Sequence, residues 1–375
     1  MTSPTSATSS GAGTAPADAA AGSGHGRPAR PGSVPALIFL RDQGIFILFV
    51  AVIVLFSIAA GAIFASFDNA MLIVAAAAVT AVFAAGVAIG AMSGALDLSV
   101  PGTAALAAVV TGKIIVGGGN VWLGIAAGLV LGVVVGAANG IITLRGLNPL
   151  VVTIGTLSVL SGIAAVLTEG QPIGNLDSLS FLGNDRVWRI PASAFVVAAV
   201  FLVGWVFLTR TRGGVRLLAV GGNAEAARRS GVPSDRYRIL GFALTGVCSA
   251  LGGIMIAATT TQASPAASVG ILFDALTAVA LAGVALSGGR GSLPKVLIGA
   301  LIIATINNGL VILNVQPYWT LTITGLLLIG ALMLEKFLAK TLADRIVSLG
   351  AASAHVPAPT STATATPTAT GKEAS

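Results

Sequence analysis

The chain has 375 residues, of which 55% are hydrophobic and 9% are charged, and its mean hydropathy is +0.96. A soluble domain carries about 25% charged residues, so this composition excludes a conventional cytosolic enzyme, a secreted disulfide scaffold and a nucleic-acid-binding module. It predicts an all-α polytopic membrane protein.

The two ends of the chain differ in composition from the part between them. Residues 1–34 consist mainly of Ala, Ser, Thr, Gly and Pro, and residues 350–375 repeat that composition. Such segments bury too little apolar surface to offset the entropy of ordering, so we expect two disordered tails. The predicted membrane domain covers residues 35–349. Its first apolar run has no small-residue cleavage site, which indicates a transmembrane helix rather than a removed leader.

Apolar blocks between polar breaks give the expected membrane spans. A helix needs about 20 apolar residues to cross roughly 30 Å of hydrocarbon. Ten blocks reach or approach this length, and they cover residues 44–66, 70–93, 100–117, 121–144, 147–168, 191–208, 239–260, 269–287, 293–314 and 319–335. The third and the eighth are short, and both begin beside Pro or Gly.

The basic residues predict the orientation of these spans. If the N-terminus is cytoplasmic, seventeen of the twenty Lys and Arg residues lie on the cytoplasmic side, and the exceptions are Lys113, Arg186 and Arg189. Cytoplasmic loops are enriched in Lys and Arg, so this bias places both termini in the cytoplasm. The net charge of +7 is then explained by loops that face membrane lipids, without a nucleic-acid partner.

The reactive side chains are few. One cysteine, Cys248, lies inside an apolar run, so packing is its expected role. Both histidines, His25 and His355, lie in the tails. The apolar body therefore lacks an imidazole for metal binding or general-base catalysis, and we predict neither a metal site nor a catalytic residue.

The chain contains an internal repeat. A shift of 169 residues aligns Ser99-Val100 with Ser268-Val269, Gly119 with Gly288, Asn139-Gly140 with Asn308-Gly309 and, after a one-residue gap, Pro149 with Pro317. Halves that are separated by five spans have opposite orientations, so the pattern predicts two inverted five-helix repeats. Inverted repeats are typical of transporters, whose short or broken spans lie close to the substrate route.

Two carboxylates, Asp97 and Asp274, lie well inside the apolar blocks. A charge at the bilayer centre costs at least about 2.5–3.5 kcal/mol, so such residues face a protein interior or a water-filled cavity. We expect Asp97 or Ser99 to cap the start of the third span, with Pro101 in its first turn. Direct contact with a substrate is the alternative. For Asp274 we expect a backbone end or an asparagine as a structural partner.

Neutral polar groups lie at the ends and in the interior of the spans, namely Asn139, Asn148, Thr153, Thr156, Asn307 and Asn308. Hydrogen bonding between helices is their simplest role. The same groups match the hydroxyls of a polyhydroxylated substrate without burying a charge. Together with Asp97, Ser99 and Asp274 they are candidates for the substrate pathway.

The loop 209–238, between the sixth and seventh spans, contains a predicted short helix over residues 224–230. Asn223 is its expected N-cap, Glu225 suits its N-terminus, two arginines suit its C-terminus, and Gly231 ends it. A charge-polarised helix held clear of the membrane is either a connector on anionic headgroups or a docking helix for a cytoplasmic partner.

These residues carry a family resemblance. Glu225-Ala226-Ala227 followed by Gly231 resembles the EAA loop of ABC-importer permeases, whose short helix seats in a groove of the ATP-binding subunit. Further motifs resemble the ribose-type sugar permeases in the same order, and they are Leu96–Val100, Ala138–Gly140, Pro149–Gly155, Gly221–Asn223, Ala226–Gly231, Gly288–Gly291 and Asn307–Leu310. The resemblance covers residues 44 to 336. Two positions depart from it: Pro101 replaces a usual Gly, and Gly283-Val284-Ala285 replaces a usual Gly-Gly-Thr.

The resemblance implies a permease subunit of an ATP-driven importer in the bacterial cytoplasmic membrane. Its implied partners are a cytoplasmic ABC ATPase that binds ATP and Mg, an extracellular or periplasmic binding protein that delivers a ribose-like pentose or a hexose, and a second copy of this chain. The residues implied to couple to the ATPase are Gly222, Asn223, Glu225, Ala226, Ala227 and Gly231. The chain has no G-x-x-x-x-G-K-[ST] sequence, so we expect no phosphate-binding loop and no cofactor of its own.

Other functions stay open at this point. Within the importer family the solute is alternatively a nucleoside, a signalling furanose or a branched-chain amino acid. A secondary transporter coupled to an ion gradient would depend on Asp97 and Asp274, and it leaves the capped cytoplasmic helix without a role. A membrane-embedded enzyme would need a cluster of catalytic residues, which the sequence does not offer.

Overall fold

The computed structural model describes residues 33–316, 318–333 and 336, with side chains from Gln43 onward. The two predicted tails, 1–34 and 350–375, lie outside the described residues, except that Ser33 and Val34 begin the first helix.

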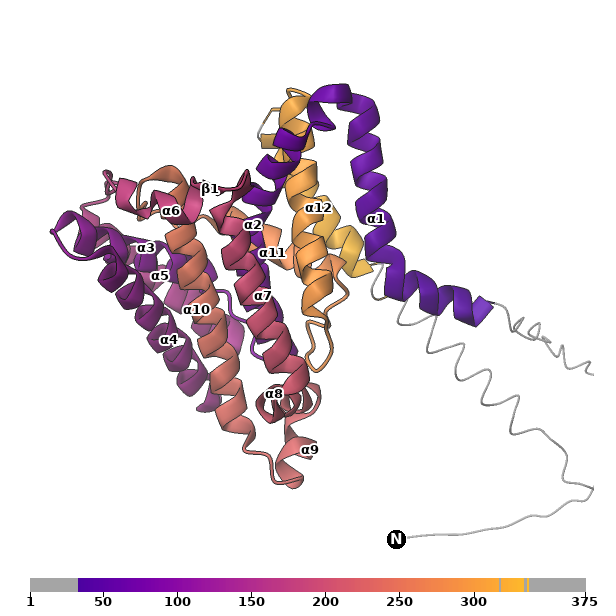
Figure 1. Ribbon diagram of the computed structural model, residues 1–375. Coiled ribbons are helices and arrows are strands. Elements are labelled where there is room, and N and C mark those ends of the chain that lie inside the picture. The colour runs from indigo at the N-terminus through magenta and orange to yellow at the C-terminus, as the bar shows by residue number, and fades with distance from the viewer. Residues whose placement is uncertain (1–32, 317, 334–335, 337–375) are drawn as a thin grey trace, which may run out of the picture.

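The described chain is mainly helical, which confirms the predicted class of an all-α polytopic membrane protein in outline (Figure 1). The principal helices are α1 (Ser33–Phe64), α2 (Phe67–Met92), α3 (Val100–Val116), α4 (Val121–Leu144), α5 (Pro149–Thr168), α7 (Ala192–Arg210), α10 (Ser234–Thr260), α11 (Val269–Leu281), α12 (Leu293–Ile312) and an unlabelled helix Tyr318–Met333. Each overlaps one predicted span. Seven are long and apolar enough to cross a membrane, whereas α3, α11 and Tyr318–Met333 are shorter.

Smaller elements lie at the two ends of the bundle. Between α5 and α7 the chain forms η1 (Asp177–Leu179), α6 (Ser180–Gly183) and the antiparallel strands β1 (Arg186–Val187) and β2 (Ile190–Pro191). Between α7 and α10 it forms α8 (Arg212–Gly222) and α9 (Ala224–Arg229). Figure 1 shows α6 and β1 at one end, here called the α6 end, and α8 and α9 at the opposite end, the α9 end.

Two predicted span boundaries are wrong by several residues. Helix α10 begins at Ser234 rather than at 239, because hydropathy marks the apolar part of a helix and α10 also includes polar sequence. Helix α1 begins at Ser33, and its apolar part, Gln43–Phe64, agrees with the predicted span 44–66. Helix α11 ends at Leu281 rather than at 287, because Gly283 adopts a positive φ of 65° that a helix does not contain.

Helices α2 and α10 form the centre of the fold. The apolar window of each is 61% buried, compared with 11% for α1 and 17% for α5. Helix α10 packs against α2, α3 and α4, and α2 packs against α10, α11 and α12. In Figure 1 α3, α4 and α5 lie on one flank of this pair and α1 and α12 on the other.

A row of glycines brings α4 against its neighbours. Gly124, Gly128, Gly132, Gly136 and Gly140 are all buried and follow one another every four residues. A Cβ on Gly136 would lie 2.2 Å from the Phe242 carbonyl oxygen of α10, and one on Gly132 would lie 2.4 Å from the Gly246 carbonyl oxygen. The α4 and α10 backbones are therefore in direct contact, as in membrane helix pairs built on small residues.

Candidate functional site

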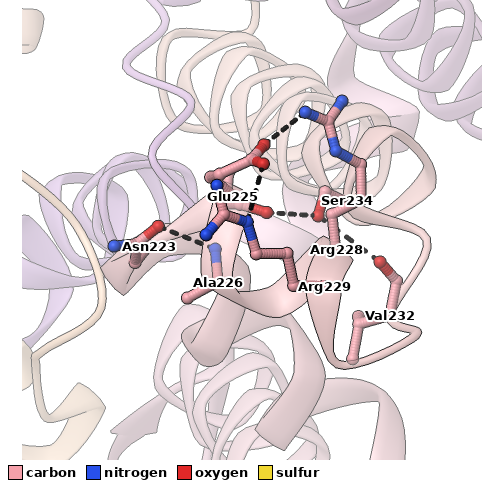
Figure 2. A network of polar contacts seen from close by, with 8 residues as sticks. Asn223, Glu225, Ala226, Arg228, Arg229, Val232 and Ser234 are labelled. Carbon is pink, nitrogen blue, oxygen red and sulfur yellow. Dashed lines mark hydrogen bonds and ion pairs between the residues drawn. The ribbon is translucent and has the colours of Figure 1, made fainter.

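The first candidate site is α9, the short helix at the α9 end, and it is capped at its N-terminus. The Asn223 side-chain oxygen accepts a hydrogen bond from the Ala226 backbone N–H at 2.9 Å, as an N-cap does (Figure 2). The predicted helix over 224–230 is thereby confirmed, ending one residue earlier at Arg229.

Glu225 joins the two arginines of α9. Its carboxylate forms ion pairs with Arg228 and with Arg229, the latter at 3.1 Å (Figure 2). The hydrogen bond from Arg228, followed by that from Arg229, lowers the pKa of Glu225 below its ordinary value. All three side chains are exposed, so these pairs fix the shape of the charged surface more than they stabilise the fold.

Gly231 terminates α9. Its φ of 80° lies in the left-handed region, its N–H bonds to the Arg228 carbonyl at 3.0 Å, and the Val232 N–H bonds to the Ala227 carbonyl at 3.0 Å. This pattern closes a helix C-terminus and favours glycine at that position. The Ser234 hydroxyl then donates to the Ala224 carbonyl at 2.8 Å and ties the start of α10 to the helix (Figure 2).

The six predicted coupling residues divide by their exposure. Asn223, Glu225, Ala226 and Gly231 are exposed around α9, whereas Ala227 is buried and holds the helix against the protein. Gly222 is exposed as well, yet its backbone packs against another loop, because a Cβ on Gly289 would lie 2.5 Å from the Gly222 Cα.

The end of α8 is joined to α2 and to the loop 283–292 through backbone contacts. The Gly289 N–H donates to the Met92 carbonyl at 2.9 Å. A Cβ on Gly221 would lie 1.9 Å from that same carbonyl oxygen, and one on Gly288 would lie 2.3 Å from the Gly221 carbonyl oxygen. Three separate segments thus meet without side chains between them, directly before α9.

The second candidate site is a buried chain of polar groups that begins at Asp97. The carboxylate oxygen of Asp97 accepts hydrogen bonds from the Ser99 N–H at 2.7 Å and from the Ser99 hydroxyl at 2.6 Å. The Asn139 amide donates to the Ser99 hydroxyl oxygen at 2.9 Å, and the Thr156 hydroxyl donates to the Asn139 oxygen at 2.7 Å. These four residues, all predicted pathway candidates, connect the loop before α3 with α4 and α5.

This chain corrects the predicted capping role of Asp97. Ser99 occupies the N-cap position of α3, but its side chain makes no capping hydrogen bond, and Asp97 bonds to Ser99 rather than to the first-turn amides. Asp97 is 3% exposed, and Ser99 and Asn139 are each 1% exposed. Buried polar groups need hydrogen-bond partners, and in this chain each residue is the partner of the next.

The remaining pathway candidates lie apart from this chain. Asn308 in α12 forms a reciprocal amide pair with Asn69 of α2, at 2.9 and 3.0 Å. Asp274 in α11 is hydrogen-bonded by the Thr324 side chain, so the predicted backbone or asparagine partner is wrong. Asn307 is half-buried beside Asn308, and its side chain has no hydrogen-bond partner within residues 43–316 and 318–333.

Two further candidates have local structural roles. Asn148 caps α5 by accepting from the Leu150 N–H at 2.9 Å. The Thr153 hydroxyl donates back to the Pro149 carbonyl at 2.9 Å within the same helix. Each hydrogen bond is satisfied within one turn of α5, which sets these two residues apart from the buried chain.

Three features of the site were not predicted from the sequence, namely Asn69, Thr324 and the contact of Gly288 and Gly289 with Gly221. Asn69 is a lone amide near the start of an apolar span, which is a signal of the same kind as Asn139. Thr324 and the glycines carry no such signal, because their importance depends on which distant segment lies opposite. Among the described residues no group of three or more His, Cys, Asp or Glu side chains is arranged to hold a metal ion.

Comparison with known proteins agrees with this architecture. The family described as "Branched-chain amino acid transport system / permease component" matches residues 69–332. The L-arabinose transport system permease protein AraH of Escherichia coli (strain K12) is 33% identical over 279 residues, covering 74% of this chain and 85% of the relative. The ribose import permease protein RbsC of Bacillus subtilis (strain 168) is 34% identical over 249 residues, covering 65% and 77%.

A third relative, the D-allose transport system permease protein AlsC of E. coli (strain K12), is 31% identical over 307 residues and covers 81% of this chain and 94% of its own. No solved structure matches the chain. The resemblance to sugar-type ABC permeases and the membrane localisation are confirmed. With a family match across most of the apolar body, and relatives that share about a third of their residues over most of their length, the chain belongs to the family of branched-chain amino acid transport system permease components.

Proposed function

We propose that the chain is the membrane-spanning permease subunit of an ATP-driven importer that carries a monosaccharide, either a ribose-like pentose or a hexose. The relatives named for L-arabinose, ribose and D-allose support this solute class. A binding protein delivers the sugar at the α6 end. ATP and Mg belong to a separate ATPase, and the chain itself contributes no catalytic residue and no cofactor site.

The observation that carries this proposal is the structure of α9. A helix of six residues is closed by Asn223 and Gly231, anchored by the buried Ala227, and presents the exposed Glu225 and Ala226. An isolated helix this short is unstable in water, so its capping and anchoring favour a surface shaped for a partner. We assign that partner as the cytoplasmic ATPase.

The distribution of charge supports a cytoplasmic α9 end and both termini on that side. Arg212, Arg216, Arg228 and Arg229 lie in α8 and α9, whereas the exceptions Arg186 and Arg189 lie in and beside the β-hairpin at the α6 end (Figure 1). Loops rich in Lys and Arg face the cytoplasm. Arg210 stacks over the Trp205 ring at 5.7 Å near the same end of α7, as expected for an anchor at the membrane interface.

We also propose ten spans in two inverted repeats. Helices α3 and α11 begin 169 residues apart, at Val100 and Val269. The neighbours correspond as well: α4 packs on α10 and α3 while α12 packs on α2 and α11, and α10 packs on α3 while α2 packs on α11. Such a set of matched pairs is expected when α1–α5 and the helices from α7 onward share one arrangement.

A second copy of the chain completes the pathway in this proposal. Helix α5 exposes Val151, Val159 and Val166, and a Cβ on Gly155 or Gly162 would have no neighbour within 4 Å. Small residues beside exposed apolar ones allow the close approach of another membrane helix. We therefore place the interface of a homodimer on α5, with lipid around the other exposed faces.

The coupling assignment can be tested with purified permease, ATPase and binding protein in proteoliposomes. We expect Glu225→Arg and Gly231→Val to reduce sugar uptake per ATP hydrolysed while leaving the amount of inserted permease unchanged. Glu225→Asp is the matched control, because it keeps the carboxylate that faces Arg228 and Arg229. Unchanged uptake by Glu225→Arg and Gly231→Val would overturn the docking role of α9.

The solute can be identified in the same vesicles. D-ribose, L-arabinose and D-allose are compared with L-leucine, each with a co-encoded binding protein. Uptake of a monosaccharide that requires ATP supports the proposal. Uptake of leucine instead, or uptake that continues without ATP and follows an ion gradient, would replace it with an amino acid permease or with a secondary carrier.

A further inference from the structure

A cavity of about 220 Å³ lies between α3, α10 and α11. Water occupies about 30 Å³ per molecule in the liquid, so the cavity has room for one small solute and is too small for a peptide. It opens beside the loop 261–268, which follows α10 at the end away from α9. It therefore lies on the side from which the proposed binding protein would deliver its cargo.

Small side chains create this space. Ala104, Ala105 and Ala108 of α3 line it together with Gly253 and Ala257 of α10. At its floor the two helices touch, because a Cβ on Gly253 would lie 2.2 Å from the Ala104 carbonyl oxygen. Phe83 of α2 also lines the cavity. Its ring packs directly against Gly252 of α10, where a Cβ would lie 2.6 Å from the ring, and this contact holds the ring in place. The aromatic wall is thus rigid, and the opposite wall is smooth and apolar.

The loop side of the cavity is polar and carries no charge. Gln262, Ser264 and Ser268 line it, and all three are exposed. The Ser264 hydroxyl oxygen accepts from the Ala266 N–H at 3.2 Å, which leaves its own proton to donate. Ser268 stands at the N-cap of α11 without making a side-chain cap. An amide and two hydroxyls supply both donors and acceptors.

The composition of the lining selects among solute classes. A branched-chain amino acid brings an ammonium and a carboxylate, and the cavity lining contains no charged side chain to pair with either. Leaving such groups unpaired away from water is costly. An uncharged sugar ring suits the lining, because its C–H faces can pack against alanine and phenylalanine while its hydroxyls bond to Gln262 and the serines.

We propose that this cavity binds one uncharged monosaccharide ring within each protomer during transport. This inference rests on the proposed sugar import. It goes further by stating where the solute is held and why an amino acid is rejected. Gln262, Ser264 and Ser268 are its specificity-determining side chains, and the alanines of α3 define its width.

Site-directed labelling tests occupancy directly. Cys248 is buried and is the one cysteine of the sequence, so Cys248→Ala provides a cysteine-free background. Ala266→Cys and Ile271→Cys, at two lining positions outside the specificity-determining set, are introduced singly and labelled with a methanethiosulfonate reagent in nanodiscs that contain the whole complex. At a concentration of the transported sugar ten times its Kd, labelling slows about tenfold, because about a tenth of the sites stay empty. L-leucine leaves the rate unchanged.

Control positions separate site protection from a general change. Ser230→Cys in α9 is exposed at the opposite end and is labelled at the same rate with and without sugar. The cavity site is overturned if D-ribose, L-arabinose and D-allose leave the labelling rate of all three cysteines unchanged while the wild-type complex transports one of these sugars. That result would leave the proposed import function standing.

Filling the cavity gives a second test. Ala108→Leu projects a larger side chain into it, and we expect uptake to fall roughly tenfold or more while ATP hydrolysis stimulated by the binding protein is retained. Ala126→Leu, on an exposed position of α4, keeps wild-type uptake. Wild-type uptake by Ala108→Leu would contradict the proposal. If the wild-type complex imports none of the sugars, the proposed function and the cavity site fail together.

Discussion

In the proposed inverted repeat, helices α4 and α12 occupy corresponding places, and different contacts hold them. α4 packs on α10 through Gly132, Gly136 and Gly140, and on α3 through Gly124 and Gly128. The positions 169 residues later in α12 are Leu293, Leu297, Leu301, Thr305 and Gly309. α12 instead contributes side chains such as Val296, Ala300 and Ile303 to the main apolar core. A shared arrangement of helices therefore does not require shared contacts.

The asparagines at the ends of these helices differ in the same way. Asn139 joins a chain with Ser99 and Thr156 inside the first half, whereas Asn308 pairs with Asn69, which belongs to the other half. The position of the amide is repeated, and its partner is not. The hydrogen bonds of Asn139 thus stay within α1–α5, whereas those of Asn308 join the two proposed halves.

The largest expected effect on stability is at Gly136, in the glycine row that α12 does not share. We expect Gly136→Val to cost about 3 kcal/mol or more, because its Cβ alone would lie 2.2 Å from the Phe242 carbonyl oxygen. The yield of monodisperse protein and its melting temperature measure this. Gly330→Val in the helix Tyr318–Met333, where a Cβ also meets nothing within 4 Å, keeps the wild-type values. Equal behaviour of the two variants would remove backbone contact as the reason for the glycine row.

The next largest effect is expected at Asp97. Asp97→Ala leaves the Ser99 N–H and hydroxyl without their buried acceptor, at a cost of about 2–4 kcal/mol. Asp274→Ala removes one hydrogen-bond partner, Thr324, and should lower stability by about 1–2 kcal/mol. Melting of the detergent-solubilised variants orders the two. A larger loss at Asp274 would show that the first half does not depend on its polar chain.

A smaller effect measures the contact between the halves. A double-mutant cycle on Asn69→Ala and Asn308→Ala should give a coupling energy of about 1 kcal/mol, in the range of interhelical hydrogen bonds in membranes. Asn307→Ala, combined with Asn69→Ala, is the matched cycle and should show additive losses. Additivity for Asn308 as well would mean that the amide pair adds nothing to the packing of α2 on α12.

The smallest effect concerns pH at α9, outside both halves. Because Arg228 lowers the pKa of Glu225, its ion pairs support α9 above the unfolded-state pKa of the carboxyl, and this support is lost as pH falls through the lower folded-state pKa. Hydrogen exchange of the Val232 N–H should therefore stay slow at neutral pH and quicken only in acid. Glu225→Gln should remove that pH dependence. A pH-dependent change that persists in Glu225→Gln would assign it elsewhere.

Much of the helical layout was predictable, because apolar blocks, caps and breakers act locally. Asn223 and Gly231 delimit α9 through hydrogen bonds within a few residues, and Asn148 caps α5 in the same way. Ser99 shows the limit of local reasoning. It occupies the predicted cap position, yet Asp97 and Asn139 take up its hydrogen bonds.

The partners of buried groups were not predictable, since they depend on segments far apart in the sequence. Asn69 and Asn308 are 239 residues apart, and no local pattern connects them. The boundaries of α10 and α11 were misplaced for a different reason, because hydropathy reports where apolar sequence ends and a helix ends where its backbone conformation changes.

The contact of Gly221 with Met92 and of Gly288 and Gly289 with α8 has a mechanical consequence. Side chains between moving parts absorb small displacements by changing rotamer on the picosecond to nanosecond scale. Here the three backbones are in direct contact. Any displacement of α8 would therefore move the end of α2 and the loop before α12 by nearly the same distance. A single methyl group added at this contact would therefore shift α8 relative to α2, because no side chain there can move to make room for it.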